Sequence, residues 1–182
     1  MEGGIRAWEG LVAEGLPEAG TAFFRGAEKP EELLALAWML EEGSRRFYAE
    51  VVALLSDDDA KKLIQSLATA EEHHKAALIS LYSSFSGIEP GQDFPGSLVR
   101  TSAAGDIMEG GMRVSEALQW AKEKSGAEIL ELAIALETNA YDLYIRMTRQ
   151  MNDDKSRQVF DHLSEEEKKH LELLTGLFEK KV

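Results

Sequence analysis

The sequence predicts an all-α fold: a four-helix bundle of two helical hairpins joined by a long crossover, with a short N-terminal appendage. Four long segments carry apolar residues at spacings of three, four and seven, the pattern of a helix with one buried face. No segment shows the period-two alternation of a strand. The second half also repeats the first without gaps, because Glu41, Glu71 and His74 recur 96 positions later as Glu137, Glu167 and His170.

The first hairpin begins at Pro30, a residue suited to the first position of a helix, and acidic residues follow it where the helix dipole favours them. We expect this helix to run to about Ser56. The aspartates at positions 57–59 form the turn, and the second helix ends near positions 83–87. The inward stripes of the two helices are Leu34, Trp38, Glu41, Tyr48, Val52 and Leu55, then Leu63, Leu67, Glu71, His74, Leu78 and Leu81.

From position 87 to 113 the composition shifts to glycine, proline, serine and aspartate, which predicts the crossover. A short helix is expected over 114–124. Ser125 followed by Glu128 matches a capping box that opens the third bundle helix, and Asp153 with Asp154 begins the last. The inward stripes are Ile129, Ala133, Glu137, Ala140, Tyr144 and Met151, then Phe160, Leu163, Glu167, His170, Leu174 and Leu177.

Composition excludes several classes of function. The 182-residue chain has no cysteine, which excludes disulfides, thiolate metal sites and a cysteine nucleophile. Its net charge of -13 argues against nucleic acid or an anionic membrane as a partner. No apolar run approaches the ~20 residues of a membrane span, and the N-terminus lacks a signal-peptide pattern. We therefore expect a cytoplasmic protein.

The repeated glutamates and histidines predict a dinuclear metal site. Glu41 and Glu71 lie at similar distances before and after Asp57, so at ~1.5 Å per residue their side chains meet at one height above the turn. The spacing of three in each Glu-x-x-His unit puts carboxylate and imidazole on one helix face. Carboxylates with imidazole and no sulfur suit two iron ions, with manganese as an alternative. Two divalent ions would also balance four buried carboxylates.

Simpler interpretations exist for some of these residues. Acidic runs are usually solvated helix faces, but these glutamates fall on stripes otherwise made of leucine. His73 and His162 have no counterpart in the repeat, so we expect them at the surface. For the repeated pair Tyr48 and Tyr144, a plain core role and a role in orienting the carboxylates both stay open.

The chain resembles the rubrerythrin-type, ferritin-like di-iron proteins over roughly residues 30–180. The matching stretches are MLEEGSRRFY, AEEHHKAAL, ALETNAYDLY and EEEKKHLELL. The resemblance implies that two iron ions are held by Glu41, Glu71, His74, Glu137, Glu167 and His170. It implies that Tyr48 and Tyr144 orient the ligands, that hydrogen peroxide or dioxygen is the substrate, and that an external redox donor protein supplies electrons. A homodimer is also expected.

Two departures from that family stand out. Typical rubrerythrins carry a further glutamate three residues after the third-helix ligand, where this chain has Ala140. They often also carry a cysteine-ligated rubredoxin domain as electron donor, and this chain has no cysteine. Electrons must therefore come from another protein.

The N-terminal GGIRAWEGLVAEGLPE resembles the end of a rhodanese-type sulfurtransferase domain. We interpret residues 1–28 as such a tail, with an upstream rhodanese domain as a partner, and residues 29–182 as the bundle. An ordinary amphipathic lead-in is the alternative. The catalytic cysteine loop of rhodaneses is absent, so no sulfurtransferase activity follows for these residues.

Three functions fit these observations. The first is a di-iron oxidoreductase that reduces peroxide or dioxygen. The second is ferritin-like oxidation and storage of iron. The third is a non-catalytic, metal-stabilised dimerisation module of a sulfurtransferase fusion.

Overall fold

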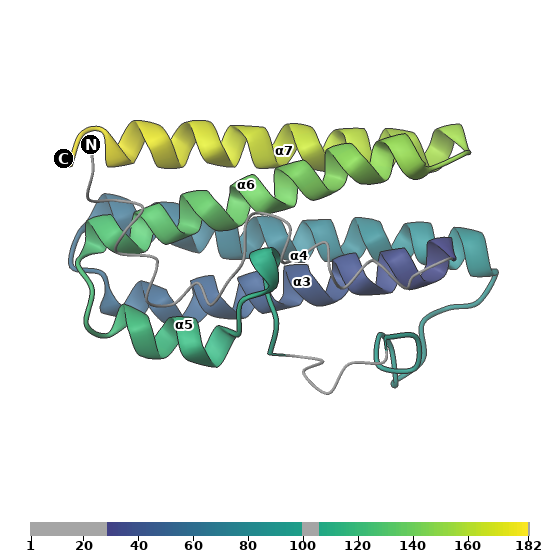
Figure 1. Cartoon of the computed structure of the whole chain (residues 1–182), viewed down its shortest axis with the longest axis horizontal. Coiled ribbons are helices and arrows are strands. Elements are labelled where there is room, and N and C mark those ends of the chain that lie inside the picture. The colour runs from purple at the N-terminus through teal and green to yellow at the C-terminus, as the bar shows by residue number, and fades with distance from the viewer. Residues whose placement is uncertain (1–28, 100–105, 182) are drawn as a thin grey trace.

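Two helical hairpins lie side by side in the computed structural model, which describes residues 29–99 and 106–181 (Figure 1). In the first hairpin α3 (Pro30–Val51) packs on α4 (Asp58–Ser86), and in the second α6 (Gly126–Gln150) packs on α7 (Asp154–Phe178). Contacts between α4 and α7 join the hairpins, and the short α5 (Val114–Ala121) packs against α3. The predicted all-α, ferritin-like bundle is confirmed, and the two described ranges contain no strand.

The helix starts follow the predicted caps. The Asp57 carboxylate accepts a hydrogen bond of 2.8 Å from the Ala60 N–H, and Asp153 caps α7 in the same way. Ser125 and Glu128 form the full capping box, since each side chain accepts a hydrogen bond from the other's backbone N–H. Each cap satisfies a backbone donor that the helix itself leaves unpaired, a stabilisation of about 1 kcal/mol.

Two helix ends differ from the sequence-based expectation. α3 ends at Val51 rather than near Ser56, and a 3-10 turn, η1 (Val52–Leu54), follows it. Leu55 is already extended, with φ -76° and ψ 141°, because the chain must turn there to place Asp57 at the start of α4. α5 ends at Ala121, three residues earlier than expected. The N-terminal segment with its rhodanese-like pattern lies outside the described residues.

The core consists of two apolar clusters with a charged layer between them. Along α3, for example, Leu34 and Leu40 belong to one cluster and Phe47 and Val51 to the other, with Glu41 between them. α7 follows the same order, and the antiparallel α4 and α6 follow the reverse order, so Glu71, Glu137 and Glu167 also lie between the two clusters. None of the described helices is both long and apolar enough to cross a membrane.

The end of the crossover is folded onto the bundle. A 3-10 turn, η2 (Glu109–Gly111), contacts both α3 and α6. The Met108 N–H donates to the Met112 carbonyl at 3.0 Å, which closes a tight loop. This loop lies so near α3 that a Cβ atom on Gly43 would sit 2.1 Å from the Ile107 carbonyl oxygen. Position 43 therefore requires glycine.

Gly43→Ala should destabilise the protein by about 1–3 kcal/mol, because the added methyl group overlaps backbone atoms that cannot rotate away. Gly176→Ala is the matched control, since it also changes a helical glycine but nothing lies within 4 Å of the new Cβ. That control should stabilise the protein by roughly 0.5–1 kcal/mol through helix propensity. Urea unfolding measures both, and equal effects would show that the crossover does not pack here.

Candidate metal centre

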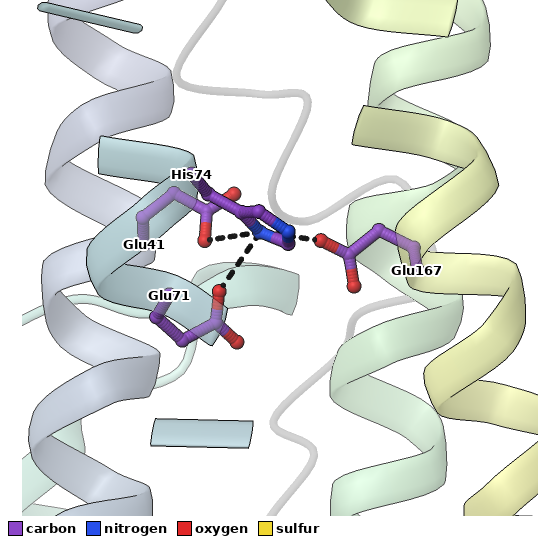
Figure 2. Close-up of side chains that lie close together, drawn as sticks. All are labelled: Glu41, Glu71, His74 and Glu167. Carbon is purple, nitrogen blue, oxygen red and sulfur yellow. Dashed lines mark ion pairs between the residues drawn. The ribbon is translucent and has the colours of Figure 1, made fainter. Parts of the chain in front are cut away.

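A first group of candidate ligands joins α3, α4 and α7 in the charged layer (Figure 2). Glu41, Glu71, His74 and Glu167 are all at most 2% exposed, and their ligand atoms lie within 4.8 Å of one another. His74 Nδ1 is at the centre of this group. It lies 2.9 Å from Glu167 Oε1, 3.1 Å from Glu71 Oε2 and 3.4 Å from Glu41 Oε2.

A second group joins α6 to α7 and consists of Glu137, Glu167 and His170. His170 Nδ1 lies 2.9 Å from Glu137 Oε2 and 3.4 Å from Glu167 Oε2. Glu167 thus belongs to both groups, with Oε1 toward His74 and Oε2 toward His170. The two imidazole rings are roughly parallel, with centroids 5.7 Å apart. All six predicted residues therefore meet in one place, and one carboxylate connects the two halves.

The donor atoms of the first group fit a cation better than they fit one another. Both oxygens of Glu41, Oε2 of Glu71 and Oε1 of Glu167 are buried without a hydrogen-bond partner. His74 Nδ1 has three carboxylate oxygens within 3.4 Å, yet none in hydrogen-bonding geometry. Buried polar atoms are rarely left in this state, because each unmade hydrogen bond costs about 1–3 kcal/mol. A metal ion would satisfy several of these lone pairs together.

The surroundings set the charge of the carboxylates. Burial raises the pKa of Glu41 well above its usual range, and the neighbouring Glu71 raises it further. Burial and the charge of Glu137 raise the pKa of Glu167 to about 8. Burial also opposes the ionisation of Glu137, but hydrogen bonds from His170 and Tyr48 bring its pKa below the ordinary value. Without metal, the folded cluster retains protons on some of its carboxyl groups.

The two histidines also hold protons, because the neighbouring carboxylates favour the charged form of each imidazole. Burial alone would lower the pKa of His170, but hydrogen bonds to Glu137 and Glu167 raise it to about 10. The pKa of His74 is likewise raised despite burial, chiefly by the charge of Glu41. Metal binding at these nitrogens must therefore displace protons.

The two repeated tyrosines are both buried but differ in their contacts. The Tyr48 hydroxyl donates a hydrogen bond of 2.5 Å to Glu137 Oε1 in the other hairpin. Burial and the charge of Glu137 raise the pKa of Tyr48, so the hydroxyl keeps its proton. The repeat predicts the same contact from Tyr144 to Glu41, but neither oxygen of Glu41 accepts a hydrogen bond. The Tyr144 ring instead stacks on Phe160 at 5.9 Å.

Comparison with known proteins agrees with this geometry. The family model described as Rubrerythrin matches residues 32–178. The chain belongs to the rubrerythrin family. No curated protein matches it. A solved structure described as a hypothetical protein from Pyrococcus furiosus is similar, with a TM-score of 0.62 and 21% identity over 85% of this chain and 91% of that one. At this identity the likeness supports the fold alone.

This rubrerythrin-family centre has two acidic neighbours that sequence reasoning missed. Glu166 Oε2 lies 3.2 Å from His74 Nε2, close enough for an ion pair with the imidazole but not in hydrogen-bonding geometry. Glu109 of η2 is only 3% exposed, and its burial raises its pKa well above the usual range. The charges of Glu71, Glu167 and Glu137 raise that pKa further. Glu109 has no counterpart in the repeat, so the sequence offered no signal for it. His73 and His162 are exposed, as expected.

The metal-free protein should lose stability as pH rises from about 5 to about 10. The folded state binds more protons than the unfolded chain because the pKa of Glu167 is raised from 4.5 to about 8 and that of His170 from 6.5 to about 10. Stability is therefore greatest below the unfolded pKa values and falls as pH passes the folded ones. Urea unfolding after removal of metal by a chelator measures the slope.

Glu167→Gln should flatten this slope, because it removes one titrating group and also one of the two carboxylates that raise the pKa of His170. With Mn(II) added, the free energy of unfolding should instead rise with pH, since deprotonated ligands bind metal better. A free energy of unfolding that stays constant across this pH range would mean that the cluster is not buried.

Tyr48→Phe should weaken Mn(II) binding about 10-fold, because it removes the hydroxyl that orients Glu137. Tyr144→Phe is the control, and it should bind Mn(II) like the wild type because the Tyr144 hydroxyl does not bond to Glu41. Competition with a coloured chelator measures both. Equal losses in the two variants would contradict the different roles of the tyrosines.

Proposed function

We propose that this chain is a di-iron oxidoreductase that reduces hydrogen peroxide to water with electrons from an external donor protein. The observation that supports it most strongly is the position of Glu167. Its two carboxylate oxygens face two separate imidazole groups, which suits a carboxylate shared between two ions. Dioxygen is the second oxidant that we consider.

The donor set favours iron over zinc in this proposal, since it offers carboxylates and imidazoles without sulfur. Manganese has similar preferences and serves as a redox-quiet probe. Two iron(II) ions held by these residues would supply one electron each, and these two electrons with two protons would convert one peroxide molecule into two water molecules. The sequence contains no cysteine to hold a further redox centre, and we assign the return of electrons to a separate donor protein.

The protein's own side chains prepare the reaction. Glu41 and Glu71 lie with His74 in one donor group and Glu137 lies with His170 in the other, while Glu167 belongs to both. Tyr48 keeps its proton and orients Glu137 by a direct hydrogen bond. The apolar clusters on both sides limit access of water, which strengthens electrostatic interactions within the layer.

Assembly and location complete the proposal. We place the protein in the cytoplasm as a homodimer, with an upstream rhodanese domain as a partner. Iron storage requires a large assembly with a mineral core. A purely structural dimerisation module requires bound metal without turnover. These two alternatives give different outcomes in the following experiment.

Protein loaded anaerobically with iron(II) should consume one peroxide molecule for every two iron ions, faster than it consumes dioxygen. Stopped-flow absorbance and a peroxide assay measure the rate and the ratio. The variant with alanine at Glu41, Glu71, Glu137 and Glu167 should lose both bound iron and turnover. Glu179→Gln, at an exposed position beyond α7, should match the wild type.

The proposal fails if the bound iron does not react with peroxide. Uptake of many iron ions per chain into a mineral would instead indicate storage. A stable metal centre that reacts with neither peroxide nor dioxygen would indicate the structural dimerisation module.

A further inference from the structure

Glu109 is a buried acid that the proposed reaction does not yet use. It lies in η2 of the crossover, outside the bundle helices, and is only 3% exposed. Its Oε2 atom has no hydrogen-bond partner, and its carboxylate is bonded to its own backbone N–H. Within residues 29–99 and 106–181, no cationic side chain forms an ion pair with it. Apart from its own backbone N–H, this carboxylate has lost its water without gaining a partner.

The loop that carries Glu109 is held firmly in place. Gly110 and Gly111 have positive φ values of 73° and 75°, and the Met108 carbonyl accepts a hydrogen bond from the Gly111 N–H while the Met108 N–H donates one to the Met112 carbonyl. On one side the loop touches Gly43 of α3. On the other, a Cβ at Gly110 would lie 3.0 Å from the Asn139 side chain of α6. The loop is therefore wedged against both helices that carry the single glutamate ligands.

A second anchor fixes the loop from the α5 side. The Asp106 backbone carbonyl accepts a hydrogen bond of 3.0 Å from the Val114 N–H. The Asp106 carboxylate accepts two more from Ser115, at 3.1 and 2.7 Å. These contacts hold the segment from 106 to 115 without help from Glu109. The loop has another source of stability, so a buried acid is not needed to build it.

The charges around Glu109 have the same sign as its own. Glu71, Glu167 and Glu137, from three different helices, all act on it electrostatically. Burying an acid against other acids is unfavourable unless a cation joins them. The sites that a cation would occupy are those of the two donor groups already described.

We propose that Glu109 is a further carboxylate ligand of the metal centre, supplied by the crossover loop. This inference rests on the metal centre of the proposed function. Glu109 lies outside the two groups whose donor atoms are within 4.8 Å of one another, so it reaches the ions by rotation of its side chain. It then exchanges its own backbone N–H for the metal, while the loop stays in place.

The alanine at position 140 explains why this carboxylate would come from the crossover and not from α6. It lies one turn beyond Glu137 on the same face of α6, is 4% exposed, and neighbours Asn139, which the Glu109 loop contacts. An acid at position 140 could serve the centre directly from α6. With alanine there, the crossover can supply the carboxylate instead.

The test compares Mn(II) binding by the wild type, Glu109→Gln and Glu116→Gln. Glu116 is the matched control, an exposed glutamate on α5 beyond the same loop. Glu109→Gln keeps the shape of the side chain, so it should weaken Mn(II) binding about 10-fold or more. The unfolding midpoint of its metal-free form should be unchanged or higher, and Glu116→Gln should match the wild type in both measurements. The double variant Glu109→Gln with Ala140→Glu should recover part of the affinity.

Crystals of the Mn(II)-loaded wild type give a direct readout by anomalous scattering. A Glu109 oxygen about 2.0–2.3 Å from an ion would support the inference. It is overturned if this oxygen lies beyond about 3 Å from every ion, or if Glu109→Gln binds Mn(II) as tightly as the wild type. Weaker binding together with a lower midpoint of the metal-free variant would assign a structural role and would also overturn it.

The outcomes separate this inference from the proposed function. Normal peroxide consumption with wild-type metal affinity in Glu109→Gln would refute the ligand and leave the function intact. Metal bound through Glu109 in a protein that does not react with peroxide would support the ligand and refute the proposed function. A wild type that binds no metal would refute both.

Discussion

The repulsion among buried carboxylates is the constraint on which the rest of this bundle depends. Glu41, Glu71, Glu137 and Glu167 come from four helices and meet where water is excluded, with Glu109 close by. In water, such charges would repel weakly, but in a protein interior each needs a proton, a hydrogen bond or a cation. The raised pKa values of Glu41, Glu167 and Glu109 express this need. The two apolar clusters on either side must supply the stability that the charged layer lacks, which explains why the buried glutamates are confined to one level of the bundle.

The internal repeat suggests symmetry, but the structure does not follow it fully. Tyr48 bonds to Glu137 across the hairpins, while its counterpart Tyr144 stacks on Phe160. Glu167 faces both histidines, and the crossover loop packs against α3 and α6. The two halves of the centre therefore present different surroundings, and two ions bound there would differ in affinity and in potential.

The crossover is more than a connection between hairpins. Its final segment is closed by hydrogen bonds, anchored through Asp106 to α5, and fitted against Gly43 so closely that no side chain is tolerated there. Packing of this kind restricts the loop to one position over the charged layer. The end of the crossover thus has one fixed conformation and borders the buried glutamates.

The sequence by itself determined the helices and the six central residues. Helical periodicity, the caps at Asp57, Ser125 and Asp153, and the repeat of Glu41, Glu71 and His74 all depend on local spacing, which the order of residues records directly. It did not determine the end of α3, which depends on the turn into Asp57, or the contrast between Tyr48 and Tyr144, which depends on how the hairpins cross. It gave no sign of Glu109, because an acid beside two glycines in a crossover carries no periodic pattern. Only the tertiary structure decided that this loop folds back between α3 and α6, since contacts between segments distant in sequence arise from packing and not from spacing.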